Sequence, residues 1–438
     1  MNPETNLRLA LTGDSIIARD VFAAEDVPTQ ELVRLIREAD VAFTNLEVLP
    51  NNFRGYPALE SGGSHFGAPA TVIDYLTAAG FDLFATATNH ALDYSIAGLL
   101  AMIEVLEEKG VTFAGVGRNL AEARMPAYLE HPGGTVALLA CASTFAKGQI
   151  AAEQRPDLTG RPGVNPLRHD TTYEITPAQL ANLRQMAEQL GLEQRRLEKI
   201  QLGFGFPPDD SDVFPFLDAN FREAEQAAIV TKPKAKDAEA IAKWVREARN
   251  RADLVILSLH AHEQGAGKED PAAFIPEFAH QMVEAGADLI VGHGPHLLRG
   301  LELYQGKPIF YSLGNFIAQN DLTYKLPADD YEQFRVDPNL TPGEVYRQRS
   351  EDGAKGFPAD RRYWETLVPL LHFQGGALRE ITLYPVSLGH GQPTSRRGRP
   401  KRAEGEVARE ILERFAELSR PYGTRIEIGH DQAGVVLE

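Results

Sequence analysis

Short apolar runs and longer amphipathic segments alternate along the first 145 residues. The apolar runs predict buried strands, at 7–14, 41–48, 81–89, 111–117 and 135–143. Segments with helical spacing of their apolar residues lie between several of these runs, at 29–40, 70–80 and 95–110. Such alternation is typical of βα units around a mostly parallel sheet, and functional side chains gather at the strand ends of such sheets.

The pattern changes at about residue 150 and returns at about residue 236. Residues 177–200 are highly charged and predict one long helix, and residues 203–216 predict an aromatic, proline-rich loop. We expect an insertion that lies over the core, with phenylalanines that shape a substrate pocket: Phe204, Phe206, Phe214 and Phe216. The alternative is that the charged helix projects as an arm or a partner surface.

The second half of the chain continues the α/β pattern. It predicts helices and strands at 236–251, 253–260, 271–286 and 287–293, and later elements at 365–373, 377–386 and 403–420. The polar segment 319–360 is too long for a plain connector, and we expect a lid or disorder there. The expected organisation is a core over 1–318 with an insertion at about 150–235, which residues 361–438 complete as one domain.

Potential metal ligands follow the predicted strands. They are Asp14, Glu47, Asn89 with His90, His260, and the two histidines of Gly-His-Gly-Pro-His, His293 and His296. Carboxylates, imidazoles and one amide oxygen form a mixed set that suits Mn, Zn or Fe. Individually, an Asp can form a turn, an Asn can cap a helix and a Glu can be solvated. When all of these residues lie together at one edge of a sheet, they predict a metal site.

His260 and His262 are alternative candidates for one position in the site. The two residues alternate at the end of a predicted strand, so we expect only one of them to point into the site, and we favour His260.

Charge and composition narrow the class of protein. A formal net charge of -17 argues against nucleic-acid binding, which needs clustered Lys and Arg. No run reaches the roughly 18–20 apolar residues of a membrane span. The first strand begins almost at once without a signal-like leader, so we expect a cytoplasmic protein; a homo-oligomer stays open. Cys141 lies in an apolar run and predicts a buried small side chain.

Several short motifs of the chain resemble those of a known protein family. "GD", "NLE", "NHALD", "SLHAHE", "GHGPH" and "GKPIFYSLGNF" occur in this order. Together they resemble the CapA, or poly-γ-glutamate synthesis, family of capsule biosynthesis, which belongs to the calcineurin-like metallophosphoesterases. The similarity covers about 7–148 and 236–318 and extends to the C-terminal tail. It implies a four-layer αββα sandwich with a helical insertion.

The resemblance also implies roles. Asp14 and His296 match ligands of a first metal, and Glu47 stands at the bridging position. Asn89, His260 and His293 match ligands of a second metal. His90 matches the histidine that contacts the substrate oxyanion or protonates the leaving group, and Asp93 is placed to orient it. One or two divalent Mn, Zn or Fe ions are implied, and the first site is expected to be weak or empty.

Departures from the family pattern explain that expectation. The first motif reads Asp-Ser-Ile where two-metal phosphoesterases have Asp-x-His, so one ligand is missing unless His65 or His262 completes the site. Glu47 replaces an aspartate, "HAH" replaces His-Trp-Gly, and "GHGPH" lacks one histidine of the usual motif.

Three functions are therefore open. The first is a metal-dependent hydrolase of a phosphoester or an amide or γ-glutamyl bond, in a small-molecule or peptide substrate. The second is a metal-independent epimerase of a peptide or amino acid, with Asp14 and His296 as acid and base. The third is a non-catalytic accessory protein of polymer synthesis. Metal content, and the effect of a chelator on activity, would separate the first two.

Overall fold

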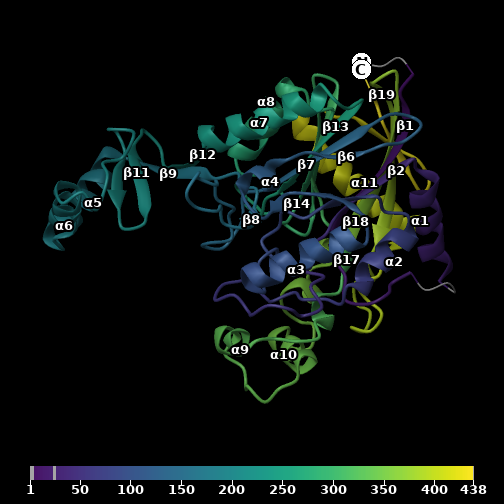
Figure 1. Cartoon of the computed structure of the whole chain (residues 1–438), viewed down its shortest axis with the longest axis horizontal. Coiled ribbons are helices and arrows are strands. Elements are labelled where there is room, and N and C mark those ends of the chain that lie inside the picture. Colours follow the sequence, from purple (N-terminus) through teal and green to yellow (C-terminus); the bar gives the residue numbers. More distant parts are fainter. Residues whose placement is uncertain (1–3, 23–25, 438) are drawn as a thin grey trace.

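The computed structural model describes residues 4–22 and 26–437 and has a mixed α/β fold (Figure 1). One sheet has the strand order β21-β22-β19-β18-β1-β2-β3-β4, in which β1 to β4 are parallel. Its strands are β1 (Asn6–Ile16), β2 (Val41–Asn45), β3 (Leu83–Ala85), β4 (Thr112–Ala114), β18 (Glu365–Gln374), β19 (Ala377–Ser387), β21 (Ile426–Ile428) and β22 (Ala433–Val435). Two further strands pair at its side, β17 (Asn315–Ala318) with β1 and β20 (Lys401–Arg402) with β19.

A second sheet has the order β15-β16-β14-β13-β7-β6. Its strands are β6 (Ala127–Leu129), β7 (Val136–Ala142), β13 (Leu254–His260), β14 (Leu289–His293), β15 (Leu298–Tyr304) and β16 (Lys307–Leu313). The four central strands are parallel, and the edge strands β15 and β6 are antiparallel to their neighbours. The α/β class predicted from the sequence is confirmed.

Alternation of side chains along the strands explains how the sheets pack. On β1, Leu7, Leu9 and Leu11 join a buried cluster that also contains Leu138 and Ile256 of the other sheet. The opposite faces are covered by helices. These are α1 (Val27–Glu38), α2 (Thr71–Ala79) and α3 (Ser95–Glu108) on the first sheet, and α7 (Ala235–Arg249) and α8 (Phe274–Ala285) on the second. Cys141, on β7, is buried on the face that packs against α7 and α8, as the prediction of a buried small side chain requires.

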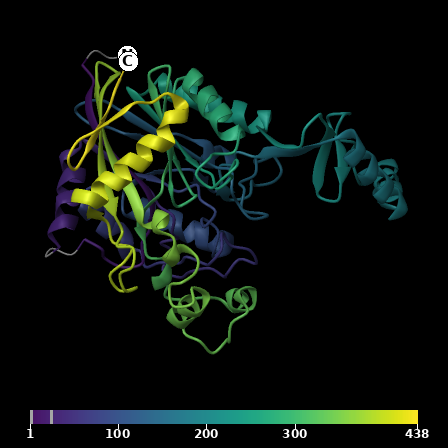
Figure 2. The same ribbon diagram turned by 180° about the vertical axis from the view of Figure 1, so that it is seen from behind.

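The C-terminal helix α11 (Gly405–Ser419) closes one side of the space between the sheets (Figure 2, yellow). Its apolar side chains Ile411, Leu412 and Phe415 belong to the same cluster as the facing sides of the two sheets. In the described residues, no helix is long and apolar enough to cross a membrane.

The insertion does not lie over the core, and that prediction is wrong. It is an arm of its own, made of β9 (His169–Ile175), α5 (Pro177–Gln189), α6 (Leu192–Gln201), β10 (Phe214–Phe216), β11 (Ala219–Glu223) and β12 (Ala228–Pro233). Figures 1 and 2 show it projecting away from the body. Antiparallel β9 and β12 lead out and back, and Leu180, Ala187 and Phe214 give the arm a small separate core.

Two details of the arm also differ from the sequence-based expectations. The predicted single helix is two helices, because Gly191 between them adopts a left-handed φ of 66°. Phe204 and Phe206 are 81% and 89% exposed, and Phe214 and Phe216 pack within the arm, so these four rings shape no pocket at the candidate site. The projecting alternative is the one that the fold adopts.

The segment 319–360 folds into short helices. It contains η1 (Asn320–Leu322), α9 (Ala328–Phe334), α10 (Pro342–Arg349) and η2 (Phe357–Ala359), followed by η3 (Arg361–Trp364). Asp330 and Tyr346 anchor it, since both are buried against the body. Disorder, one of the two outcomes expected from the sequence, is therefore wrong.

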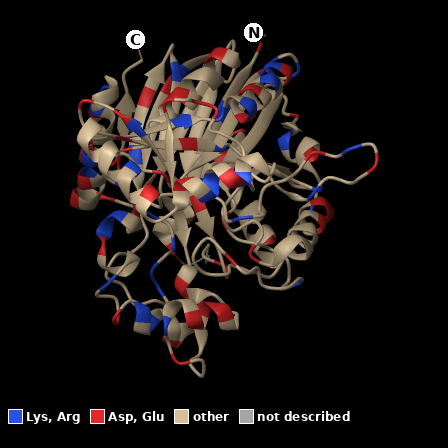
Figure 3. Ribbon diagram, turned by 90° about the vertical axis from the view of Figure 1, so that its left-hand side faces the viewer, with Lys and Arg blue, Asp and Glu red and all other residues tan. Residues whose placement is uncertain are grey.

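Surface charge is mixed. In Figure 3, Lys and Arg are interspersed with Asp and Glu over the face toward the viewer. Many charges of the molecule pair locally, for example Arg118 with Glu107 and Glu122 at 2.8 and 2.7 Å. This face is a solvated surface rather than a basic platform.

Candidate metal centre

The polar residues that follow the parallel strands meet at one edge of the two sheets. Asp14 lies in β1, Glu47 follows β2, and Asn89 and His90 follow β3. His260 and His293 end β13 and β14, and His296 lies in the turn after β14. All seven side chains are buried. Strand order and direction thus bring together residues that are almost 300 positions apart in the sequence.

A local irregularity of β1 presents Asp14. The register of β1 shifts on both sides of Asp14, against β2 and against β17. Gly13 approaches the backbone of Gly314 so closely that a Cβ would lie 1.9 Å from the Gly314 oxygen. The Asp14 N–H donates to that same oxygen at 2.8 Å. Only a glycine allows this crossing, which aims the next side chain into the site.

The carboxylate of Asp14 is well supplied with donors. Asn45 Nδ2 donates to Oδ1 at 2.8 Å and the Gly294 N–H donates to Oδ2 at 3.1 Å. His296 Nδ1 lies 3.3 Å from Oδ2. Burial works to raise the pKa of Asp14, but the hydrogen bond and charge of His296, with His293 and Asn45, outweigh it and hold the pKa below its ordinary value. Asp14 is therefore a stable anion.

Three histidines place ring nitrogens against one another. His260 Nδ1 is 3.1 Å from His293 Nδ1, and His260 Nε2 is 3.0 Å from His262 Nε2. Burial lowers the pKa of all three, and repulsion from neighbouring imidazoles adds to it. For His293 the pKa falls to about 4, although Asp14 opposes the shift. Neutral imidazoles are the form that binds metal ions.

The prediction that only one of His260 and His262 points into the site is wrong. Strand β13 ends at His260, so alternation no longer applies to the next residues. The His262 N–H donates to Thr144 Oγ1 at 2.9 Å, which turns the chain back. The His262 ring then lies 5.2 Å from the ring of His296, beside the centre.

Glu47 is the one carboxylate of the site without a donor. Both of its oxygens are fully buried and have no hydrogen-bond partner in the described residues. His260 Nε2 and His296 Nδ1 lie 3.6 Å from it and His90 Nε2 lies 4.0 Å from it. Burial, then the charge of Asp14 and the close approach of the Asp14 carboxylate, which would accept a hydrogen bond from a protonated Glu47, and then the charge of Asp93 raise the pKa of Glu47 well above its ordinary value. A buried carboxylate left in this state is costly, and a cation among these imidazoles would remove the cost.

Two groups of side chains have the spacing of a metal site. Asp14, His260 and His293 form one, and Glu47, His262 and His296 form the other, with ligand atoms within 4.8 Å of one another in each. His262 thus supplies an imidazole where the sequence motif lacks one. The donor set and the unpartnered Glu47 fit a divalent cation.

His296 is held in a strained backbone conformation. Its φ is 63°, in the left-handed region that residues with a Cβ seldom adopt. Asn315 Oδ1 lies 3.0 Å from His296 Nδ1, and Ser312 Oγ donates to the Leu297 carbonyl at 2.7 Å. The "YSLGNF" motif therefore fixes the turn that carries His296, and such strain is typical of functional sites.

His90 is oriented by Asp93. Asp93 Oδ2 lies 2.8 Å from His90 Nδ1 and accepts the Phe66 N–H at 2.7 Å, and the Phe66 ring packs against the imidazole at a tilt of 31°, with centroids 4.4 Å apart. These contacts leave His90 Nε2 directed at the centre. The geometry is that of a base and its orienting carboxylate.

Two further residues, His65 and Arg299, differ from the sequence-based expectations: the first lies away from the centre, and the second was not predicted. His65 does not complete the site, because its Nδ1 lies 2.9 Å from Asp330 and its Nε2 2.9 Å from the Ala58 carbonyl. Arg299, fully buried on β15, donates to the Glu263 and Lys268 carbonyls at 3.0 Å and so holds the loop after β13. The only signal for it in the sequence is an arginine inside an apolar strand.

Comparison with known proteins identifies the family. Residues 8–320 match the family model described as bacterial capsule synthesis protein PGA_cap. The chain belongs to this family. It is 35% identical to Uncharacterized protein y4sH of Sinorhizobium fredii, over 98% of this chain and 92% of that protein. The resemblance to CapA is confirmed.

Two more relatives carry descriptive names. Capsule biosynthesis protein CapA of Bacillus anthracis is 24% identical to this PGA_cap protein, over 80% of this chain and 74% of that protein. A probable polyglutamine synthesis accessory protein of Mycobacterium tuberculosis is 30% identical over 24% of each chain.

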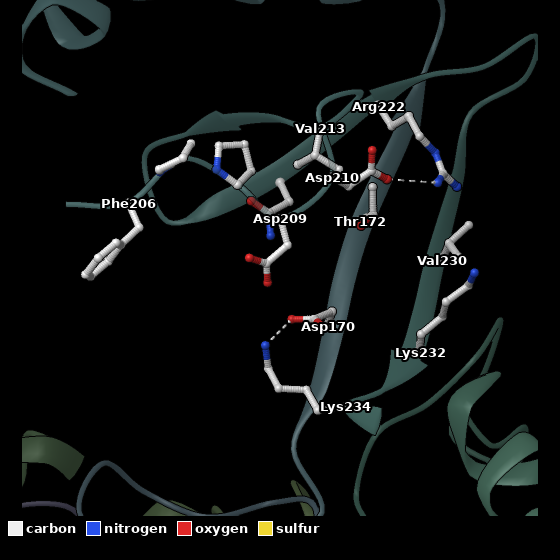
Figure 4. A pocket seen from close by; sticks show the side chains of 13 residues that line it. Asp170, Thr172, Phe206, Asp209, Asp210, Val213, Arg222, Val230, Lys232 and Lys234 are labelled. Carbon is white, nitrogen blue, oxygen red and sulfur yellow. Dashed lines mark ion pairs between the residues drawn. The ribbon is translucent and has the colours of Figure 1, made fainter. Parts of the chain in front are cut away.

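Cavities of this PGA_cap protein adjoin the centre on two sides. One of about 300 Å³ is lined by His90 and His296, and another of about 690 Å³ by Asn89 and His262. A third, of about 470 Å³, lies in the arm, where Lys234 pairs with Asp170 at 2.7 Å (Figure 4). The arm cavity is lined by none of the histidines of the centre, so of these three cavities only the first two adjoin it.

Proposed function

We propose that this PGA_cap protein is a metal-dependent hydrolase with a calcineurin-like αββα sandwich. Its substrate would be a small molecule or peptide, cut at a phosphoester or at an amide or γ-glutamyl bond. One observation carries the proposal: the fully buried carboxylate of Glu47 has no donor and faces imidazole nitrogens of His260, His296 and His90 at 3.6–4.0 Å. A cytoplasmic location is part of the proposal.

The residues that would hold one or two Mn, Zn or Fe ions are those predicted from the sequence, joined by His262. They are Asp14, Glu47, Asn89, His260, His262, His293 and His296. Such ions, when bound, lower the pKa of water and polarise the electrophile.

The remaining chemistry comes from the chain. Asp93 holds His90 Nδ1, so that Nε2 faces the reacting bond. During hydrolysis the water oxygen would bond to phosphorus or carbon as the scissile bond breaks, His90 would give a proton to the departing atom, and the proton released by the water would return to His90 through the solvent. Asn45 and Gly294 keep Asp14 fixed and ionised.

Metal content tests the proposal. We expect elemental analysis of the purified protein, incubated with Mn, Zn or Fe, to find about one or two ions per chain, because neutral imidazoles and carboxylates converge here. His293→Ala should lose them, whereas His390→Ala, at an exposed histidine, should keep them. Hydrolysis in phosphoester and γ-glutamyl screens should stop with a chelator. Wild-type protein without metal after incubation would refute the proposal.

Gly62 gives a second test. A Cβ there would lie 2.3 Å from Asn89 Nδ2 and 2.7 Å from His90 Nε2. We expect Gly62→Ala to push both side chains aside and to lower kcat roughly 10²-fold, since misplacement by about 1 Å costs that much. Thermal unfolding should change little. Gly343→Ala is the control, because nothing lies within 4 Å of its added carbon. Equal kcat in both variants would contradict the role of His90.

Epimerisation is the second candidate. It rests on the 3.3 Å approach of His296 Nδ1 to Asp14 Oδ2, which would pair an acid with a base without any metal. Proton exchange at a substrate α-carbon that survives a chelator and is lost in Asp14→Asn would favour it over hydrolysis.

An accessory role in polymer synthesis is the third candidate, drawn from the name of the mycobacterial relative. The exposed arm, with Phe204 and Phe206 at its surface, is the natural partner surface for it. Loss of partner binding on deletion of 177–227 without loss of turnover would separate this role from catalysis.

A further inference from the structure

The smaller cavity beside the candidate metal centre is built by two parts of the chain. On the body side it is lined by Ile16, Phe66, His90 and His296. On the other side it is lined by the segment 319–360, through Tyr346, Arg349, Lys355 and Phe357. These four residues lie beyond residues 8–320, which match the PGA_cap family model.

Arg349 is the unneutralised cation of this cavity. The described residues offer its guanidinium no carboxylate within 4.0 Å; its hydrogen bond is to Ser64 Oγ at 3.4 Å. It stacks on the Phe334 ring, 3.5 Å from the centroid, and lies 5.9 Å from that of Tyr346. Stacking fixes the planar group, and its remaining N–H donors stay available.

The other charges of the cavity are already paired. Asp321 forms an ion pair with Arg397, and Lys355 forms one with Glu351. Arg349 therefore sets the sign of the cavity, in a chain whose net charge is -17. A lone oriented arginine of this kind suits a carboxylate or phosphate, which can accept two of its hydrogen bonds.

The larger cavity on the far side of Gly62 has the opposite character. Its charged lining includes Glu60, Asp329 and Glu332. Gly62 lines both cavities, so the metal centre lies between a positive side and a negative side. An anionic group of a bound molecule is repelled from one side and attracted to the other, which fixes the direction in which the molecule lies.

We propose that the cavity at Arg349 is a subsite for an anionic group of the substrate, separate from the bond that reacts. The substrate class is thus a molecule with a carboxylate or phosphate on the His90 and His296 side of the scissile bond. This rests on the proposed hydrolase function, whose substrate it specifies. Arg349 is a specificity residue and takes no part in bond cleavage.

Binding of two anionic probes tests the subsite without any need for turnover. Glutarate and phenyl phosphate are titrated by calorimetry into the full chain, both with Mn²⁺ and after metal removal. In both states we expect Arg349→Gln to weaken binding of at least one probe by 10-fold or more, because a charged hydrogen-bond donor is lost. The tighter of the two probes identifies carboxylate or phosphate as the preferred group.

Two variants control for charge and folding. Arg347→Gln removes the same charge from the same helix at a side chain that does not line the cavity and lies 3.8 Å from Asp352, and it should leave the Kd within 2-fold. Arg349→Lys should fold normally and bind with intermediate affinity. The proposal is overturned if neither probe binds the wild type, or if Arg349→Gln and Arg347→Gln weaken binding equally. If the protein binds no metal, the proposed hydrolase function fails, but the subsite does not. The titration of metal-free protein still measures whether Arg349 binds the anionic probe.

Discussion

Glu47→Gln is expected to make the metal-free protein more stable and at the same time to abolish its stabilisation by Mn²⁺. Glu47 is buried and has no donor, and its pKa is raised well above 4.5. At pH 7 the native state must either hold a proton there or keep an unpaired charge, whereas the unfolded chain ionises freely. We expect glutamine to remove this cost and so to raise the free energy of unfolding of the metal-free protein.

The pH dependence of this gain has a definite sign. A carboxyl group with a raised native pKa lowers stability as the pH rises above 4.5, and costs nothing below the pKa of the unfolded chain. The advantage of Glu47→Gln over wild type should therefore be largest at neutral pH and disappear near pH 4. Urea unfolding of chelator-treated protein measures it.

Metal addition completes the test. Excess Mn²⁺ at about 100 times its Kd should stabilise wild type by about 2.7 kcal/mol and should not stabilise the Glu47 variant. Glu263→Gln is a matched control, since that carboxylate already accepts hydrogen bonds from Ser143 and Thr144 at 2.6 and 2.9 Å. A Glu47→Gln protein that is less stable than wild type without metal would remove the main support for the centre.

Much of the site was predictable because strand ends are readable in the sequence. Apolar runs that stop at Glu47, Asn89, His260 and His293 place these residues at one sheet edge once the strands are parallel. Asp14 was found for the same reason, although it lies within β1 rather than at its end. The close crossing of Gly13 and Gly314 that presents it depends on contacts 300 residues apart.

Other features depend on contacts that no local pattern encodes. His262 turns inward because Thr144 from another strand end accepts its N–H. The sequence could not predict whether the arm covers the core or projects from it, since a charged helix with few apolar positions has the same sequence pattern in both cases. Arg349 lies in a polar segment where the sequence offers no reason to single it out, and only the fold places it in a cavity that His90 also lines.

Acidification is the second large effect that we expect, in protein stripped of metal. His293 has a pKa of about 4 in the native state, against 6.5 for an unperturbed histidine. Between these values the unfolded chain binds a proton that the native protein does not, so the free energy of unfolding falls as the pH is lowered from 6.5 to 4. One such histidine contributes about 3 kcal/mol, and burial gives His260 and His262 the same sign.

Comparison of variants separates the contribution of His293 from that of groups such as Glu47, whose effect on the pH dependence of stability has the opposite sign. The stability lost between pH 6.5 and pH 4 should be about 3 kcal/mol smaller in His293→Gln than in wild type, whereas His390→Gln, at an exposed position, should follow the wild-type curve. Bound metal would mask the effect by competing with the proton, so both curves are measured with chelator present. Parallel curves for wild type and His293→Gln would mean that the native pKa of His293 is not lowered, which would contradict a buried imidazole that stays neutral for a metal ion.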